Sequence, residues 1–404
     1  MDARVRRRYA SERRFRMIGL VAVLFSGGFL TFLLVTMLAN GARGFTQTEV
    51  RLPVDFASSS LFLDAATLAG PMADTALNSA DFQSVAATAA TTAYGANGAS
   101  LISEGGWLRL RYAVRADPSV LERKADIWVP ASTELDVARK SSGAAALEAS
   151  HAELDRAGAV RTSVNWSFLG GADATDPTQV GIWGAFKGSL LTMLVTLALA
   201  FPIGVFSAVY LEEYAPRNRW TELIEVSINN LAAVPSIIFG LLGLAVFLNT
   251  FHLPRSAPFV GGLTLALMTM PVIVIAGRNA IKSVPPSIRD AALGVGASRV
   301  QVVFHHVLPL ALPGILTGTI IGMARALGET APLLMIGMRA FIASPPGGFA
   351  DPATVLPVQI FLWSDEVSRG FVEKTSAAII VLLVFLLAMN AVAIYLRNRF
   401  EQRW

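Results

Sequence analysis

Long apolar runs constrain this chain more than any other feature, because each run can cross a membrane as a helix. About 20 apolar residues are needed to span roughly 30 Å of hydrocarbon. Six runs qualify: Met17–Ala39, Ala185–Tyr210, Val226–Leu248, Phe259–Gly277, Leu310–Gly337 and Ala377–Leu396. Hydrophobic residues make up 53% of the chain and charged residues 15%, too apolar a balance for an ordinary soluble protein. The sequence predicts an all-α polytopic membrane protein with six transmembrane helices.

The distribution of basic residues predicts which helix ends face the cytoplasm. Seven arginines precede the first run: Arg4, Arg6, Arg7, Arg8, Arg13, Arg14 and Arg16. Short cytoplasmic loops carry an excess of basic residues, so this end is expected inside. The run itself is too long for a typical cleaved signal peptide and is expected to be an anchor. The same rule places the loops around Arg217, Arg289 and Arg397 inside, which predicts a multi-pass bacterial inner-membrane protein with both termini cytoplasmic.

The segment between the first two runs, residues 40–181, shifts in composition toward Ala, Ser, Thr and scattered charges. The topology places it outside the cytoplasm, so we expect a periplasmic α+β domain inserted between helices 1 and 2. Ala125–Val137 and Ser142–Ala157 are alanine-rich and predict helices. Trp107–Val114 alternates apolar and charged residues, which is typical of a half-buried strand.

The chain is thus expected to have three parts. These are a cytoplasmic arginine-rich tail with the first helix (1–39), the periplasmic domain (40–181), and a membrane core (182–404) with a cytoplasmic loop at 282–309. Four of the core runs are interrupted by proline: Pro202, Pro235, Pro271 and Pro313. Such breaks are tolerated where neighbouring helices or a water-filled cavity satisfy the freed backbone groups. Gly314, Gly318 and Gly322 offer a small face for close helix packing.

Arg325 and Glu329 are ionisable residues near the middle of the fifth run. A charge within the membrane costs several kcal/mol on most scales, so both groups are expected to face a cavity or a partner. They lie four residues apart, on one face of a helix. They form either a self-neutralising structural pair or a site where a cation, steadied by a carboxylate, steers an anion. Arg278, at the end of the fourth run, is a weaker candidate because it could be an ordinary snorkelling anchor.

The polar stretch Arg289–Pro309, RDAALGVGASRVQVVFHHVLP, lies between two apolar runs. It predicts two short helices, Pro286–Leu293 and Ser298–His306, joined at Gly296, because glycine permits a tight turn. The helical spacing of four apolar residues predicts a face that could enter a groove on another protein: Val300, Val303, Phe304 and Val307. The alternative is an amphipathic connector at the membrane surface.

This stretch resembles the EAA loop by which permeases of ABC importers dock on their ATPase. Six residues fall in register with that family's pattern: Asp290, Ala291, Ala292, Gly296, Leu308 and Pro309. Asp290 replaces the usual glutamate, and His306 stands where an apolar residue is usual. A second stretch, Ala324–Leu334 (ARALGETAPLL), is similar to a segment of the A-type permeases of Pst phosphate importers. Met270–Val274 and Leu356–Ile360 resemble the same family.

The resemblance implies an ABC-importer type I permease core that forms half of a pathway for inorganic phosphate. It implies that Arg278 and Arg325 match arginines needed for phosphate passage. Glu329, four residues after Arg325, would moderate the affinity of that arginine for the anion. The implied partners are a related C-type permease, two copies of a cytoplasmic ATPase, a periplasmic phosphate-binding protein and the lipid bilayer, with no nucleic acid. ATP and Mg would be bound by the ATPase, and this chain contains no Gly-x4-Gly-Lys-Ser/Thr loop of its own.

No catalytic residue, metal site or cofactor is expected in this chain, so it is not expected to be an enzyme. His305 and His306 are adjacent rather than one helical turn apart, which is poor geometry for a shared metal. Asp173 and Asp176 are interpreted as turn residues near Pro177. Two alternatives to phosphate transport are a permease for another oxyanion, such as phosphonate, sulfate or molybdate, and a membrane signalling or scaffold protein with a sensing outer domain.

Overall fold

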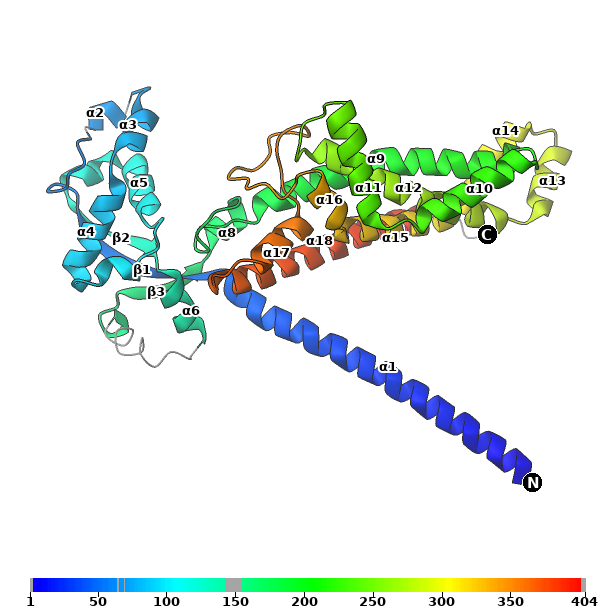
Figure 1. The fold of residues 1–404 in the computed structure, drawn as a ribbon, viewed down its shortest axis with the longest axis horizontal. Coiled ribbons are helices and arrows are strands. Elements are labelled where there is room, and N and C mark those ends of the chain that lie inside the picture. The colour runs from blue at the N-terminus through cyan, green and yellow to red at the C-terminus, as the bar shows by residue number, and fades with distance from the viewer. Residues whose placement is uncertain (1–2, 64, 69, 142–153, 401–404) are drawn as a thin grey trace.

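The computed structural model describes residues 3–63, 65–68, 70–141 and 154–400. An N-terminal helix, a small domain of strands and helices, and a long helical bundle follow one another (Figure 1). The N-terminal helix and the small domain consist of α1 (Ala3–Gly44), β1 (Thr46–Asp55), α2 (Ala65–Leu68), α3 (Ala73–Ser79), α4 (Phe82–Tyr94), α5 (Trp107–Ala116), β2 (Lys124–Pro130), α6 (Thr133–Ser141), β3 (Val160–Val164) and α8 (Trp166–Gly170).

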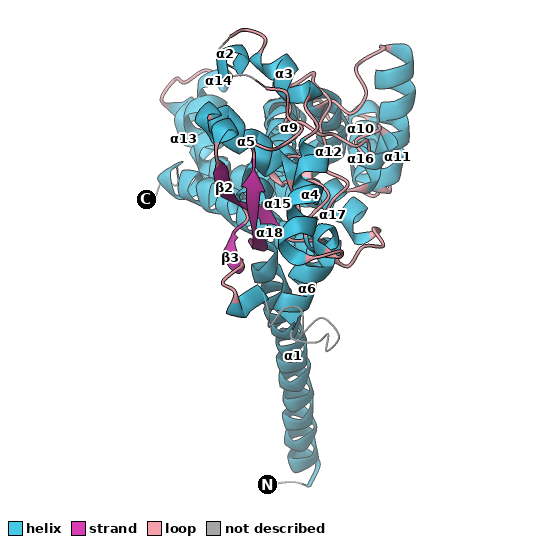
Figure 2. Cartoon of the chain, turned by 90° about the vertical axis from the view of Figure 1, so that its left-hand side faces the viewer, coloured by secondary structure: helices cyan, strands magenta, loops and turns pink. Residues whose placement is uncertain are grey.

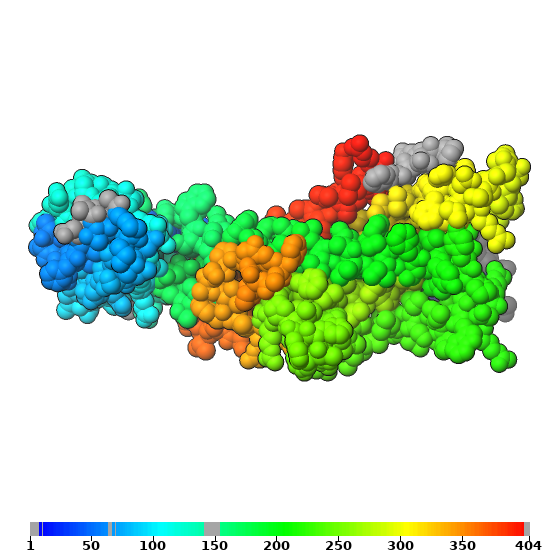
Figure 3. Space-filling model, turned by 90° about the horizontal axis from the view of Figure 1, so that it is seen from above, coloured from blue at the N-terminus to red at the C-terminus, as the bar shows by residue number. Residues whose placement is uncertain are grey.

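The bundle is built from longer helices and short segments that join them. Its elements are α9 (Trp183–Val209), α10 (Arg219–Ala232), α11 (Ser236–Leu242), α12 (Pro258–Lys282), α13 (Pro286–Gly294), α14 (Arg299–Gln301), α15 (Leu308–Gly328), α16 (Ala331–Met335), α17 (Leu356–Ser364) and α18 (Gly370–Phe400). In the space-filling view, the small domain and the loop around α13 and α14 lie at opposite ends of the molecule (Figure 3). We call residues 46–181 the outer domain.

The outer domain is organised around an antiparallel three-stranded sheet in the order β2-β1-β3 (Figure 2). Leu52 of β1 pairs with Ile127 of β2, and Thr48 pairs with Thr162 of β3. Leu52 is fully buried, and α4 and α5 pack over the sheet. Period-two alternation along β1 therefore gives the sheet one apolar face, on which the domain's core is built.

Two secondary-structure predictions in this domain are wrong. Residues 107–114 form helix α5 rather than a strand, because Leu110 and Val114 lie one helical turn apart and are both fully buried. Residues 125–137 do not form one helix: they divide into β2, which supplies the edge of the sheet, and the start of α6. The helix predicted at 142–157 falls mostly outside the described residues.

Five helices in the described residues are long and apolar enough to cross a membrane, or up to six if one bent pair is a single span. They include Ser11–Gly44, Trp183–Tyr214, Pro258–Lys282 and Gly370–Arg399, which agree with four predicted runs. The predicted third run is not one straight helix, since α10 and the helix after it, Ser236–Thr250, meet at 103°. The break lies at Val234 and Pro235, as expected where proline removes a backbone donor.

The predicted fifth span, Leu310–Gly337, is wrong at both ends. The apolar helix runs from Arg299 to Gly328, and α16 follows as a separate short helix. The extension at the start arises because α14 passes through the π-helical segment Val302–Val307 directly into α15. The second predicted loop helix, Ser298–His306, is therefore the beginning of α15 rather than a separate element.

Helix α12 lies between α9 and α15 in the bundle (Figure 1). Glycine makes these contacts possible, since a Cβ at Gly318 would collide with Ala276 and one at Gly314 with Ala280. On the other side, Gly262 of α12 packs directly on Val195 of α9. The small faces predicted from the sequence are confirmed at Gly314, Gly318 and Gly322.

Replacing Gly318 with valine is expected to lower the thermal stability of the purified protein. The added side chain would push α15 away from Ala276, and overpacking of this kind costs about 1–3 kcal/mol. The midpoint of thermal unfolding in detergent measures the effect. Gly27→Ala in α1 is the matched control, because a Cβ at Gly27 meets nothing within 4 Å. Equal midpoints for the two variants would contradict the close packing described above.

Buried charges join the outer domain to α18. Lys140 of α6 donates hydrogen bonds to Asp136 at 2.7 Å and to Glu373 of α18 at 3.2 Å. Lys374, which is 3% exposed, donates to the carbonyl of Gly44 at 3.1 Å. Removing one member of such a set would leave another charge buried and unpaired, which is strongly destabilising. The contacts therefore fix the position of the outer domain relative to the bundle.

Helix α1 extends away from the bundle (Figures 1 and 2). Its close contacts lie near its C-terminal end, where Gly41 and Gly44 pack on α18. None of the most apolar window of Ser11–Gly44 is buried within this chain. Side chains such as Phe25 are thus available to lipid or to another protein in the membrane.

Candidate functional site

Arg325 and Glu329 lie at the point where α15 ends. Arg325 is in the last turn, and Glu329 is the first residue beyond the helix, with an extended backbone. The Nε of Arg325 lies 3.6 Å from Oε1 of Glu329, so the two form an ion pair without a close hydrogen bond. The Arg325 side chain is 49% exposed and that of Glu329 is 19% exposed. The pairing predicted from the sequence is present, and half of the arginine remains open to a further contact.

The contacts between α15 and α12 show how deep in the bundle the Arg325–Glu329 pair lies. The helices run antiparallel, with Gly314 against Ala280, Gly318 against Ala276, and Gly322 against Thr269 and Val272. Continuing the pattern places Arg325 level with residues 266–269, close to the midpoint of α12. Helix α15 ends at this depth. An exposed charge is costly here unless water or a partner solvates it.

Arg278 lies in a different part of the bundle and is already paired. Its Nη2 donates to Glu225 of α10 at 2.6 Å, and its Nε donates to Glu212 at 3.4 Å. The Arg278 side chain is 12% exposed. Counting residues along α12, it lies about 15 Å from the level of Arg325. The structure therefore does not bring the two candidate arginines together, and Arg278 is more than a snorkelling anchor.

Residues 282–309, which we call the coupling loop, turn at Gly296. Helix α13 ends at Gly294, and two residues later the backbone of Gly296 has φ = +91°. A Cβ at this position would meet nothing within 4 Å, so backbone conformation rather than space requires glycine here. Ser298 then begins the next helix with a capping box, in which the Ser298 hydroxyl accepts a hydrogen bond from the Gln301 N–H and the Gln301 side chain accepts one from the Ser298 N–H. The tight turn predicted at Gly296 is confirmed.

The four apolar residues predicted to form one face of this loop do not lie on one exposed surface. Val303 and Val307 are buried in the bundle and are not part of a docking surface. The π-helical segment Val302–Val307 alters the helical spacing on which that prediction depended. The exposed apolar side chains are Leu293, Val295, Val300 and Phe304. Of the residues matched to the EAA pattern, Asp290 is exposed beside them, whereas Ala292 is buried.

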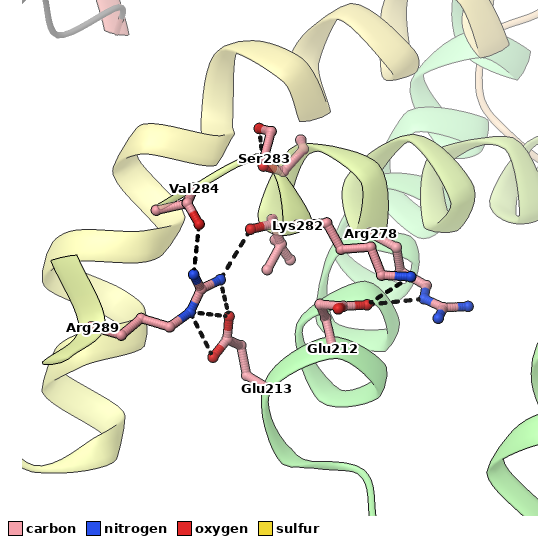
Figure 4. A network of polar contacts seen from close by, with 9 residues as sticks. Glu212, Glu213, Arg278, Lys282, Ser283, Val284 and Arg289 are labelled. Atoms are coloured by element: carbon pink, nitrogen blue, oxygen red, sulfur yellow. Dashed lines mark hydrogen bonds and ion pairs between the residues drawn. The ribbon is translucent and has the colours of Figure 1, made fainter. Parts of the chain in front are cut away.

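The coupling loop is tied to the bundle by an ion pair that the sequence did not reveal. Arg289 donates to Glu213 through Nη2 at 2.7 Å and through Nε at 3.1 Å (Figure 4). The same guanidinium donates to the carbonyls of Ile281 and Val284. Figure 4 also shows the neighbouring Glu212 facing Arg278. Because these partners are 66 to 76 residues apart, no local pattern indicates the pairs.

Polar groups elsewhere in the described residues do not assemble into a metal site. No group of three or more His, Cys, Asp or Glu side chains in that part of the chain could bind an ion. Asp176 accepts a hydrogen bond from the backbone of Thr178, as a turn residue does, and Asp173 accepts one from the indole of Trp363. His305 and His306 are exposed.

Comparison with known proteins identifies the family. Residues 164–404 match the family described as binding-protein-dependent transport system inner membrane component. The chain belongs to this family. It is accordingly a multi-pass protein of the bacterial inner membrane, a permease subunit of the ABC importer type rather than an enzyme. Residues 2–149 match a domain of unknown function, DUF3333, which includes α1 and most of the outer domain.

Several curated relatives of this permease carry related names. It is 31% identical over 232 residues to the probable ABC transporter permease protein YqgI of Bacillus subtilis, covering 54% of this chain and 77% of that one. It is 30% identical over 217 residues to the phosphate transport system permease protein PstA of Yersinia pestis, covering 53% and 71%. With PstA 1 of Mycobacterium tuberculosis H37Rv the identity is 35% over 156 residues, 39% of this chain and about half (50%) of that protein.

Solved structures of importers show weaker similarity. The MetNI methionine ABC transporter has a chain that is 16% identical, with a TM-score of 0.42, covering 55% of this permease and 95% of that chain. A bacterial ABC transporter involved in import of the acidic polysaccharide alginate has a chain that is 18% identical, with a TM-score of 0.41, covering 54% and 79%.

Proposed function

We propose that this permease forms half of the translocation pathway of an ATP-driven importer of inorganic phosphate. The observation that carries the proposal is the Arg325–Glu329 pair, half exposed near mid-depth where α15 ends. Relatives over the same region are named phosphate transport system permeases, which supports the same substrate. A C-type permease would complete the pathway and cover the open side of Arg325.

Phosphate carries one to two negative charges at neutral pH and has several acceptor oxygens. A guanidinium suits it because it presents donors in a planar fork. A lone permanent cation would bind the anion too tightly for passage. Glu329, 3.6 Å from Arg325, would weaken that binding so that the ion can leave. The pair thereby meets both needs of a pathway, entry and release.

Energy would come from two ATPase subunits on the cytoplasmic side, docked against the coupling loop. The exposed Leu293, Val295, Val300 and Phe304 offer apolar surface for that contact. In this arrangement both termini are cytoplasmic and the outer domain is periplasmic, at the end of the molecule far from the loop (Figure 3). A periplasmic phosphate-binding protein would deliver the anion there. ATP and Mg would reside in the partner subunits.

Uptake by the reconstituted complex tests the proposal. This permease, its C-type partner, the ATPase and the binding protein are placed in vesicles, and ATP-dependent entry of radiolabelled phosphate is measured. We expect uptake that excess unlabelled phosphate abolishes and that sulfate, molybdate or a phosphonate leaves nearly unchanged. Preferential competition by one of those other anions would reassign the substrate. Absence of any oxyanion uptake would overturn the proposal.

A further inference from the structure

Arg278 faces a charged hollow at the same end of the bundle as the coupling loop. The hollow has a volume of about 590 Å³ and is bordered by α10, the end of α12 and the segment after α9. Its lining combines four basic with three acidic side chains: Arg217, Arg219, Arg278, Lys282, Glu212, Glu222 and Glu225. Several cationic donors around one space suit an oxyanion with multiple acceptor oxygens.

Within this hollow, the Arg278 guanidinium already has two carboxylate partners. Glu225 and Glu212 both accept hydrogen bonds from its guanidinium, at 2.6 and 3.4 Å. Glu212 also lies 3.6 Å from Lys282. We call Arg278, Glu212 and Glu225 the Arg278 cluster. A phosphate ion that approached Arg278 would have to compete with both carboxylates for its guanidinium.

The Arg278 cluster is joined to the coupling loop through consecutive residues. Glu212 and Glu213 lie in the π-helical segment Tyr210–Tyr214, and as neighbours on a helix they point in different directions. Glu212 contacts Arg278 of α12, whereas Glu213 is bound by two nitrogens of Arg289 in α13 (Figure 4). A displacement of α13 would therefore pull on Glu213 and shift Glu212 relative to Arg278.

We propose that Glu212 and Glu225 are positioning residues that keep Arg278 from binding phosphate, and that movement of the coupling loop, transmitted through Arg289 and Glu213, releases it. This inference rests on the proposed function. In the state described here the carboxylates occupy the arginine, so an ion that has crossed is not retained at the cytoplasmic end. When the loop moves, Arg278 becomes an acceptor site for the departing anion.

Inhibition by internal phosphate distinguishes this role from a structural one. Vesicles containing the full complex are loaded with ATP, Mg and graded unlabelled phosphate, and uptake of external radiolabelled phosphate is measured. With Glu225→Gln, Arg278 loses its closest carboxylate, and internal phosphate should inhibit uptake at a concentration about tenfold lower, the value of one charge-assisted hydrogen bond. A merely structural defect would lower the rate without changing that concentration.

Glu222→Gln is the matched control, since Glu222 borders the same hollow on the same helix and forms no ion pair with a described residue. It should leave inhibition unchanged. Glu212→Gln is a second test variant and should shift inhibition in the same direction as Glu225→Gln. If uptake is normal and internal phosphate inhibits both test variants at the same concentration as the Glu222→Gln control, this inference alone is overturned. A wild-type complex that takes up no phosphate would overturn the proposed function as well.

Discussion

Replacement of Arg325 by alanine is expected to reduce phosphate uptake by roughly a hundredfold, because the passing anion would lose hydrogen bonds to a charged group, which contribute about 1.5–3 kcal/mol. The substitution removes the half-exposed guanidinium at mid-depth and leaves the Glu329 carboxylate without its ion-pair partner. That carboxylate would then repel an approaching anion. Initial rates of uptake in vesicles measure the effect, after normal expression and membrane insertion have been verified.

Two variants separate a role in anion passage from a general loss of positive charge. Arg325→Lys keeps the charge but not the fork of donors, so it should retain an intermediate rate. Arg339→Ala removes an exposed arginine beyond α16 and should have little effect. Unimpaired uptake in Arg325→Ala would show that the Arg325–Glu329 pair is structural, which is the alternative that the sequence left open.

Replacement of Gly296 by alanine is expected to weaken docking of the ATPase by about tenfold, the equivalent of 1.4 kcal/mol. A residue with a Cβ is strained at φ = +91°, at a cost of about 1–2 kcal/mol, so the coupling loop would shift to other conformations. Only the fraction of loops in the original conformation would dock. Binding of the purified ATPase to the permease in detergent, measured by titration, gives the change in affinity.

Gly294→Ala is the matched control for this prediction. Gly294 is the last residue of α13, outside the left-handed region of the backbone, and a Cβ there also meets nothing within 4 Å. Alanine should be accepted at this position, with unchanged docking. Equal affinities for the Gly294 and Gly296 variants would mean that the conformation of the turn does not govern contact with the ATPase.

Apolar length predicted most of the membrane-spanning helices, because a span must satisfy its own backbone hydrogen bonds and so depends on local sequence. The prediction was wrong where helices bend or end inside an apolar run. The apolar runs continue past Pro235 and past Gly328, whereas the backbone bends at the first position and the helix ends at the second. In the outer domain, alternation at Trp107–Val114 was misleading because burial of Leu110 and Val114 is set by packing on the sheet.

In the candidate site, too, the local features were predictable from the sequence and the long-range contacts were not. Arg325 and Glu329 could be paired from the sequence because one helical turn separates them. The turn at Gly296 was equally local. The partners of Arg278 and Arg289 were not predictable, since Glu212, Glu213 and Glu225 reach them from helices far away in the chain.

By itself, the sequence determined that this protein lies in a membrane, where most of its spans fall, that Arg325 can pair with Glu329 and that the chain turns at Gly296, because all of these depend on apolar length and local spacing. Only the tertiary structure decided that the coupling loop continues into α15 and that two adjacent glutamates connect that loop to Arg278. The physical reason is that a buried charge is stable only beside a partner, and packing of distant helices selects that partner.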